Sequence, residues 1–422
     1  MRNLLFLISL LTACCLLPTS SFADTANDLR NKISSHNEEI EKLNKEIDQY
    51  TKEIDKTATE ANTLSNAIKV LDTSRAKVTT EIKKTELNIS SANSSIEELG
   101  GEITTIEEKI TVNQAAIMAS LREINQVDDS SMVEVFLGSG SISDFIDEYE
   151  SLERFQDSIK NKTAELAVYK SELGSKKQSV EGKKKELVSL KGNLNDQKEI
   201  LDINKKEKNT LLTETKNKET EYKKILTEKQ RQKEQFEKEL FDFESQLKII
   251  VDPNSYASAK KGSLSWPLDS VFITQNFGKT ESAKRLYVSG THNGVDFRAT
   301  RGTPVKSVLA GVVKAVGNTD EQRGCYSYGK WVLVEHPNGL ASLYAHLDLI
   351  KVSSGQSINT GELVGYSGQT GYATGPHLHL TIYASEGVRI DKYASSINCK
   401  NTVVPLAPAS AYLDPMQYLP DL

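Results

Sequence analysis

Proline is missing from the long middle of this 422-residue chain, since none of its ten prolines lies between Pro18 and Pro253. Tryptophan is scarce, and both copies, Trp266 and Trp331, fall after the same gap. The part of the chain before residue 253 must therefore be built differently from the part that follows. At this length we expect two or three domains.

An excess of positive charge is also missing, because the formal net charge is −6. This argues against nucleic acid or an anionic membrane as an electrostatic partner. The apolar run at residues 4–17 is too short for a comfortable membrane span, which needs about 20 apolar residues.

The N-terminus has the anatomy of an export signal. A short positive start at residues 1–3 precedes the apolar run, and residues 21–23 form a small-residue cleavage site. We expect residues 1–23 to be removed and the mature protein to work outside the cytoplasm. Residues 11–14 also resemble a bacterial lipobox, which would place a lipid on Cys14. The apolar residues that follow Cys14 argue against that alternative.

Cysteine is rare, and only Cys325 and Cys399 remain once the signal is removed. Two thiols in an exported protein suggest a disulfide. Two unpaired thiols or a pair of zinc ligands are the alternatives.

Two heptad runs fill the proline-free region. The first extends from Leu29 to Ile124 and the second from Leu152 to Phe243, with charged and polar residues between the apolar positions. This pattern predicts a coiled coil over residues 24–251, with the first run forming a rod of roughly 140 Å. A break near residues 126–146 favours an antiparallel hairpin with its tip there. An extended dimer, in which each run pairs with another copy, is the alternative.

Short β-type segments punctuated by glycine and proline follow a linker at residues 252–264. They predict an all-β domain over residues 265–401, and an irregular C-terminal strap over residues 402–422. The expected strands are residues 271–277, 295–298, 305–316, 330–336, 340–346, 362–366 and 377–383. Residues 274–278 and 368–371 are expected to form walls of a groove.

Five of the six histidines lie between His292 and His379. His292 and Asp296 form an H-x-x-x-D pattern, and His377 and His379 form H-x-H. Imidazole and carboxylate are zinc ligands, and a catalytic zinc takes three of them. His377 and His379 share one face of a strand if Leu378 is buried on the other.

The turn dipeptide at residues 293–294 allows His292 and Asp296 to approach one another. His346 stands alone in a Tyr-Ala-His-Leu segment. His336 precedes a hairpin turn and is expected to face solvent rather than join the site.

The segments HNGVDFRA, GTPVKSVLAGVV, YAHL and TGPHLHL resemble the lysostaphin/LytM-type zinc metallopeptidases, which cut peptide bonds in peptidoglycan. The resemblance covers roughly residues 266–391. It implies a LytM-type metallopeptidase fold, one Zn²⁺ held by His292, Asp296 and His379, and catalytic roles for His346 and His377.

The order of the parts, with a signal, a long coiled-coil hairpin and then a LytM-type domain, resembles the EnvC-like murein hydrolase activators. Residues 132–155 resemble the element at the tip of their hairpins. The resemblance implies that this tip docks on an FtsEX-type transporter in the membrane.

The sequence therefore predicts an exported zinc endopeptidase of the cell wall that is controlled by its coiled-coil arm. A non-catalytic activator of a cell-wall amidase is the alternative, and a structural rod with a vestigial domain is a third. The bond that is cut, in a glycine-containing cross-bridge or in a D-amino-acid cross-link, is left open. We also expect part of the arm or residues 252–261 to cover the zinc groove.

Overall fold

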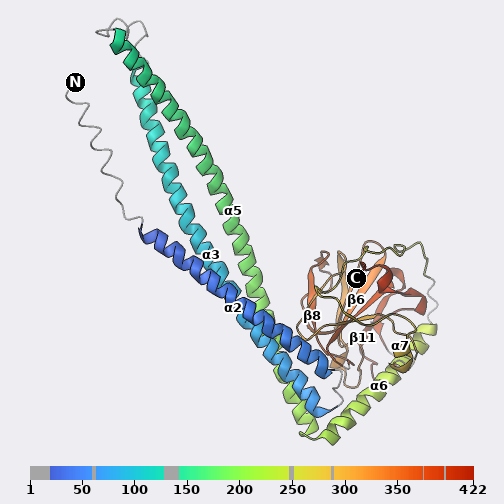
Figure 1. The fold of residues 1–422 in the computed structure, drawn as a ribbon. Coiled ribbons are helices and arrows are strands. Elements are labelled where there is room, and N and C mark those ends of the chain that lie inside the picture. Colours follow the sequence, from blue (N-terminus) through green and yellow to red (C-terminus); the bar gives the residue numbers. More distant parts are fainter. Residues whose placement is uncertain are drawn as a thin grey trace. The chain divides into compact units, whose positions relative to one another are not determined.

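The computed structural model describes residues 20–58, 63–127, 142–246, 251–286, 289–373, 375–393 and 396–422. Residues 1–42 with 83–194 form one compact unit, and residues 43–82 with 195–422 form a second. The long helices lie in the proline-free part, and the strands lie in the remainder together with the short helix α7 (Glu281–Leu286) (Figure 1). The predicted fold class, a helical coiled-coil hairpin followed by an all-β domain, is confirmed.

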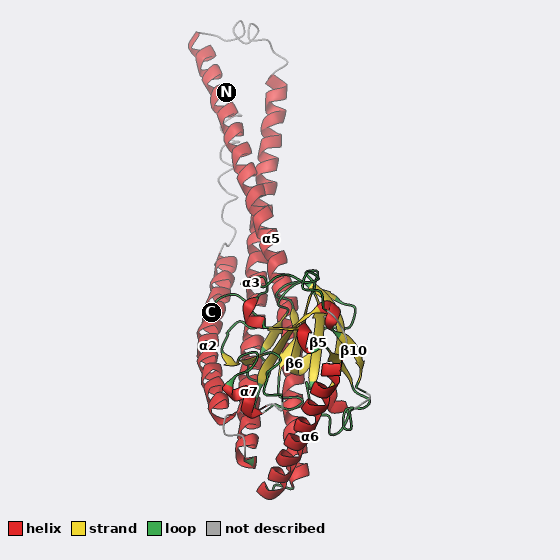
Figure 2. Cartoon of the chain, turned by 90° about the vertical axis from the view of Figure 1, so that its right-hand side faces the viewer, coloured by secondary structure: helices red, strands yellow, loops and turns green. Residues whose placement is uncertain are grey.

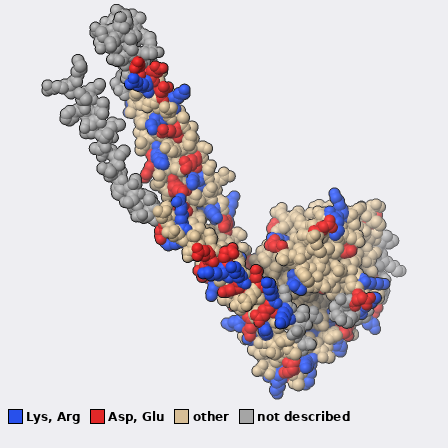
Figure 3. All heavy atoms as spheres, viewed as in Figure 1, with Lys and Arg blue, Asp and Glu red and all other residues tan. Residues whose placement is uncertain are grey.

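Four long helices occupy the proline-free part of the chain: α2 (Ser20–Ala58), α3 (Leu64–Val127), α5 (Ile142–Thr215) and α6 (Glu219–Gln246). Their surfaces carry acidic and basic side chains interspersed along the helices, as expected of a solvated coiled-coil exterior (Figure 3). Within the described residues, no helix is long and apolar enough to cross a membrane. Most of the export signal, Cys14 and residues 128–141 of the hairpin tip lie outside the described residues.

Helices α3 and α5 pair in opposite directions. In the first unit Glu102 bonds Lys176 at 2.6 Å, and Lys109 lies over the ring of Tyr169. In the second unit Asp72 bonds Lys208 at 2.6 Å. Because residue numbers rise along one helix as they fall along the other, the pair is an antiparallel hairpin, as predicted.

The predicted continuous rod from Leu29 to Ile124 is wrong. Helix α2 runs back along α3, so that Arg30 pairs with Glu98 in the first unit and Glu53 pairs with Lys69 in the second. The heptad spacing is the same before and after this reversal. A heptad pattern shows which face of a helix is buried, but it does not show which other helix covers that face.

The second heptad run is also divided, at the junction of α5 and α6. Lys216 and Asn217 adopt φ values of 50° and 55°. Left-handed residues of this kind end an α-helix, and asparagine tolerates the conformation better than most. The chain therefore changes direction at this point, and α6 continues toward the β domain as an element of its own (Figure 1).

The β domain is built on one large antiparallel sheet with the strand order β1-β2-β9-β6-β5-β4-β7. Strand β12 pairs with β9, β8 with β6, and β3 with β8. The strands are gathered in one part of the chain, beside α6 (Figure 2). Their bounds are β1 Ile273–Gln275, β2 Val295–Arg298, β3 Pro304–Lys306, β4 Gly311–Asn318, β5 Lys330–Glu335, β6 Leu340–Ile350, β7 Ser357–Ile358, β8 Leu363–Ser367, β9 His377–Ala384 and β12 Tyr412–Leu413.

One face of this sheet carries the main hydrophobic core. Alternate residues of β9, Leu378, Leu380 and Ile382, are fully buried there with Val295 and Phe297 of β2. Side chains on opposite faces of a strand alternate. The intervening residues of β9, including His377 and His379, therefore lie on the other face, where the site forms.

The C-terminal tail is more regular than the predicted strap. Strand β11 (Val403–Leu406) pairs with β10 (Arg389–Lys392), and β12 adds to the main sheet through Tyr412 and Leu413. The four prolines of the tail suggested irregular structure, but a proline is tolerated in short edge strands such as these.

The predicted disulfide between Cys325 and Cys399 is present, with a Cα–Cα distance of 4.8 Å and 74 residues of sequence separation. Both cysteines are fully buried in a small cluster with Tyr393, and Phe236 and Leu240 of α6 pack on the same cluster. The disulfide therefore forms part of the surface on which α6 lies.

Replacing both cysteines by serine should lower the free energy of unfolding of the β domain by about 4 kcal/mol, because the disulfide closes a long loop. Denaturant titration of the full chain measures this loss. Ellman titration of the oxidised, denatured wild type should find no free thiol, and two free thiols would contradict the pairing.

Candidate metal centre

Three adjoining strands bring together the residues of the candidate site. In the pairing of β2 with β9, Asp296 lies opposite His379. On its other side His379 lies opposite Ala345, the residue before His346 in β6. His292 sits just before β2 and forms an isolated bridge with Gly278. Asp296 and His379 therefore lie side by side on one face of the sheet. His346 joins them at an irregular point of β6, where the pairing with β5 shifts in register and His346 has a φ of 60°.

Gly294 permits the close approach of the ligand segments. A Cβ atom at this position would lie 2.5 Å from the carbonyl oxygen of Leu380 and 2.7 Å from the ring of His379. The predicted bend at residues 293–294 is present. Glycine is required there because any side chain would collide with strand β9.

The ligand atoms of His292, Asp296 and His379 all lie within 4.8 Å of one another. The His292 Nε2 to Asp296 Oδ1 distance is 3.3 Å, the His379 Nδ1 to Asp296 Oδ1 distance is 2.8 Å, and the two ring nitrogens are 3.1 Å apart. Ligands bound to a tetrahedral zinc at about 2.0–2.1 Å are separated by about 3.3 Å. The separations in this structure are close to that value.

Hydrogen bonds outside the cluster decide which ring nitrogens face the centre. His292 Nδ1 lies 3.1 Å from the carbonyl oxygen of Asn276, which can only accept, so Nδ1 carries the proton. His379 Nε2 lies 2.9 Å from the Thr381 hydroxyl, which can accept an N–H bond. The opposite nitrogens therefore present lone pairs beside a carboxylate. Three electron donors that converge in this way suit a bound cation.

A second pair of histidines lies next to the ligand cluster. The rings of His346 and His377 are 4.6 Å apart, and His377 Nε2 is 3.8 Å from Asp296 Oδ1. His346 Nδ1 donates to the carbonyl oxygen of Thr370 at 2.9 Å, and His377 Nδ1 donates to that of Gly375 at 2.8 Å. Both Nε2 atoms are thereby left free to exchange a proton within the site.

The titration behaviour of the cluster follows from burial and mutual charge. Burial acts to raise the pKa of Asp296, but the neighbouring His377 and the contacts with His292 and His379 hold that pKa well below its usual range. Burial, then the proximity of His377 and His379, keeps the pKa of His346 well below its usual range. Asp296 is therefore ionised, and His346 is a neutral imidazole at neutral pH.

The prediction that His336 faces solvent is wrong, because this residue is only 3% exposed. Its Nδ1 lies 3.1 Å from the carbonyl oxygen of Ala310 and its Nε2 lies 2.8 Å from the Ser342 hydroxyl. The hairpin turn that follows is real, but the strand before it is buried. His336 is a structural residue outside the cluster, as the sequence had suggested.

The residues that hold the second nitrogen of each histidine could not be found from the sequence. Asn276, Thr370 and Gly375 act through main-chain carbonyls, which carry no signal in a side-chain pattern. Thr381 alone had a recognisable position, because it follows His379 by two residues and so lies on the same face of β9.

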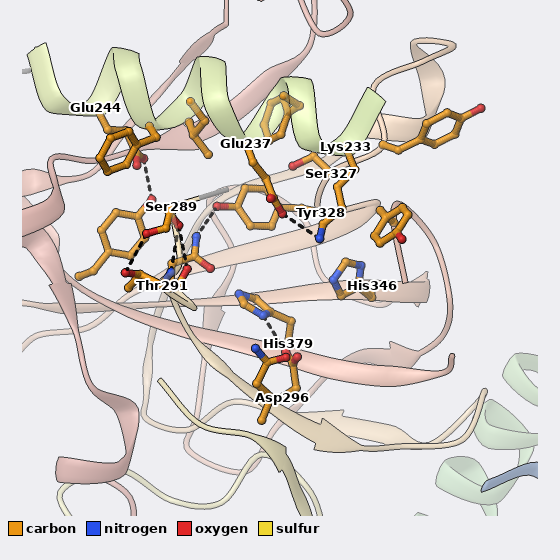
Figure 4. A pocket seen from close by; sticks show the side chains of 18 of the residues that line it. Lys233, Glu237, Glu244, Ser289, Thr291, Asp296, Ser327, Tyr328, His346 and His379 are labelled. Carbon is orange, nitrogen blue, oxygen red and sulfur yellow. Dashed lines mark hydrogen bonds and ion pairs between the residues drawn. The ribbon is translucent and has the colours of Figure 1, made fainter. Parts of the chain in front are cut away.

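A cavity of about 300 Å³ lies over this cluster and is roofed by α6. The strands below contribute Asp296, His346, His377 and His379, and α6 contributes Lys233, Phe236, Glu237, Leu240, Phe241 and Glu244. Figure 4 shows α6 crossing the pocket, with Lys233, Glu237 and Glu244 directed toward the strands that carry His346 and His379. Of the predicted groove walls, Gln275 and Phe277 line this cavity.

One face of α6 makes the contacts that hold it on the β domain. Phe236 packs edge-on against Tyr393 with ring centroids 5.7 Å apart, and Lys233 lies 4.8 Å from the ring centre of Tyr372. Leu240 is 8% exposed. These residues are spaced three and four apart, which places them on one side of the helix.

Glu244 anchors the far end of this face. It accepts hydrogen bonds from the Tyr412 hydroxyl at 2.6 Å and from the amide of Ala407 at 3.3 Å. Burial raises the pKa of Glu244 to about 7, and these two hydrogen bonds oppose the rise only in part. Docking of α6 therefore places a carboxyl group where its charged form is disfavoured.

Comparison with known proteins finds similarity in the β domain. The chain is 41% identical over 94 residues to the DD-carboxypeptidase/endopeptidase Mpg of Neisseria meningitidis serogroup B, which covers 22% of this chain and 20% of that protein. It is 37% identical over 116 residues to the peptidoglycan DD-endopeptidase ShyA of Vibrio cholerae, covering 27% and 25%. The chain thus spans about a fifth to a quarter of the length of these relatives.

Among solved structures, a zinc containing peptidase from Vibrio cholerae aligns at 29% identity and a TM-score of 0.25, covering 35% of this chain and 39% of that one. The family description that matches is Peptidase family M23, over residues 290–392. That range includes His292, Asp296, His346, His377 and His379. Residues 290–392 of the β domain are therefore similar to Peptidase family M23.

Proposed function

We propose that this chain is an exported, zinc-dependent endopeptidase that cuts peptide bonds in peptidoglycan during cell-wall remodelling or cell separation. One observation carries the proposal. Three donor atoms converge at zinc-like separations, and two further histidines beside them have their free nitrogens available. A site that merely binds metal has no need of that second pair. The name of one relative of this domain, the peptidoglycan DD-endopeptidase ShyA, supports peptidoglycan as the substrate.

The residues divide into two groups by what they do. His292, Asp296 and His379 would hold the metal, with the other nitrogen of each histidine fixed by Asn276 or Thr381. A bound Zn²⁺ would polarise the scissile carbonyl and lower the pKa of a water molecule. His346 and His377 would take the proton from that water at Nε2 and donate a hydrogen bond to the oxygen on which negative charge develops.

The coverage of the cavity by α6 supports a restraint on this activity. A substrate peptide must reach the cluster through space that Phe236, Glu237 and Leu240 now line. We propose that α6 holds the enzyme inactive and that release of the arm uncovers the groove. The predicted trigger, docking of the hairpin tip on an FtsEX-type transporter, concerns residues largely outside those described and is kept as part of the proposal.

The coverage of the groove also favours a second candidate, a non-catalytic activator of a cell-wall amidase. In that case the uncovered groove would bind a partner protein and no bond would be cut by this chain. The two candidates differ in the chemistry of the products, because an endopeptidase cuts within the peptides whereas an amidase separates peptides from glycan strands.

Metal dependence tests the first candidate. The full chain carrying Phe236→Asp, which removes an anchor of α6, should solubilise purified peptidoglycan. The activity should disappear after chelation and return with Zn²⁺ alone. Activity that survives complete removal of zinc would contradict the proposal.

A further inference from the structure

A buried ion pair of the β domain is not used by the proposed chemistry. Arg301 Nε donates to Asp348 Oδ2 at 2.8 Å and Nη2 donates to Oδ1 at 2.7 Å. Both side chains have no exposed surface. An ion pair at this depth is costly to desolvate and often no more stable than an apolar pair, so its presence calls for a reason beyond stability.

Asp348 directly supports the loop at residues 368–371. Its Oδ1 lies 3.4 Å from the amide of Gln369. A Cβ atom on Gly368 would lie 2.0 Å from the same oxygen. The loop backbone thus rests on the carboxylate, at a position where only glycine fits.

The same loop holds both histidines of the second pair. The carbonyl oxygen of Thr370 accepts from His346 Nδ1 at 2.9 Å, and that of Gly368 accepts from the amide of His377 at 3.3 Å. His346 has a φ of 60°, which is a strained value for a residue other than glycine. Such strain persists only where the surroundings fix the residue, so the loop must be rigid.

Helix α5 reaches this support within the second unit. Glu207 Oε2 lies 2.5 Å from Arg301 Nη2, which also bonds Asp348. Asp196, three turns earlier in α5, accepts from the Tyr366 hydroxyl at 2.9 Å and from Lys351 at 2.6 Å. The guanidinium of Arg301 is therefore shared between the helical arm and the carboxylate under the loop.

We propose that Arg301 and Asp348 are positioning residues that fix the loop at residues 368–371 and thereby orient His346 and His377, and that Glu207 extends this support to the arm. The consequence for hydrolysis rests on the proposed function. The orientation of the two rings does not, and it is measurable without substrate.

The kinetic test uses the full chain in the Phe236→Asp background. Asp348→Asn removes the charge and Gly368→Ala displaces the loop without changing any charge. Each should lower kcat by about 10- to 100-fold, because small displacements of catalytic groups have effects of this size. KM and zinc content should stay within about twofold. Glu207→Gln should give a smaller loss in the same direction, and Asp269→Asn, at an exposed carboxylate, is the matched control.

The spectroscopic test uses full chain labelled with ¹⁵N-histidine, which has only six histidines. In the wild type, His346 should show a single Nδ1–H tautomer. In Asp348→Asn and Gly368→Ala its signals should shift or broaden, while those of His336 stay unchanged. If Asp348→Asn fails to fold, Gly368→Ala decides the matter.

Unchanged His346 signals with kcat within about twofold of the parent would overturn the proposal. A loss of bound zinc as large as the loss of kcat would also overturn it. That result would show that Arg301 and Asp348 only stabilise the fold. If the parent shows no hydrolysis, the proposed function fails, and the ring signals still decide whether the pair positions His346.

Discussion

Replacing His346 or His377 by alanine should reduce hydrolysis by about 10²- to 10⁴-fold while one zinc remains bound per chain. Neither ring is needed to complete a three-ligand site, because His292, Asp296 and His379 already converge. Alanine at any of those three positions should instead strip the metal, since three protein ligands leave none to spare. Metal analysis of the purified variants, beside assays on peptidoglycan, separates the two groups.

His36→Ala, at a half-buried position of α2, is the matched control and should change neither quantity. Zinc lost from the His377 variant and kept by the His379 variant would reverse the assignment of these residues. Hydrolysis that persists in both the His346 and His377 variants would remove them from the chemistry.

Substitutions on the inner face of α6 should activate the enzyme. Phe236 and Leu240 are 3% and 8% exposed. An aspartate at either site loses the burial of a large apolar side chain, worth about 2–5 kcal/mol, so the equilibrium constant for docking of α6 should fall more than tenfold. Phe236→Asp and Leu240→Asp should therefore raise turnover of peptidoglycan by the full chain, with zinc content unchanged. Lys238→Asp, on the exposed face of α6, should have no effect.

Burial of Glu244 makes the docking of α6 on the β domain depend on pH. Below about pH 4.5 Glu244 is protonated whether α6 is docked or free, so pH has no effect on docking. Between pH 4.5 and about 7 only the docked form retains the proton, and docking weakens as pH rises. The activation by Phe236→Asp, relative to wild type, should thus be larger at pH 5 than at pH 8. Equal turnover by wild type and both aspartate variants at every pH would remove α6 from the regulation.

Part of the geometry of the candidate site could be predicted because its signal lies in side chains and strand periodicity. The alternation of His377, Leu378 and His379 placed two histidines on one face, and Leu378 is indeed fully buried on the other. The dipeptide at residues 293–294 correctly suggested a bend. The reason for its glycine, close packing against His379, depended on a strand distant in sequence and could not be foreseen.

The arrangement of the helices could be predicted only in part. The heptads identified the buried stripes, but they did not show that α2 folds back on α3. Nor could they show that α6 leaves the coiled coil, because Phe236 and Leu240 keep their spacing and bury themselves on Tyr393 and the disulfide instead of a helix. Spacing defines an apolar face, and tertiary contacts decide what covers it.

The β-type segments were correctly predicted to be strands, but some of their bounds were wrong and some strands were missed. The expected strand at residues 305–316 is divided into β3 and β4, and β7, β10, β11 and β12 were missed. The missed strands have two to four residues each. Segments this short are too short to show an alternation of apolar and polar residues. They can be recognised as strands only from the strands with which they pair.

The most direct measurement is the mass of the fragments released from purified peptidoglycan by the zinc-loaded Phe236→Asp protein. The account predicts that cross-linked muropeptides are converted to smaller ones by addition of one water across a peptide bond, with the peptides still attached to glycan. The His377→Ala protein in the same background should release none. Glycan strands freed of their peptides, or no products unless an amidase is added, would contradict the central claim.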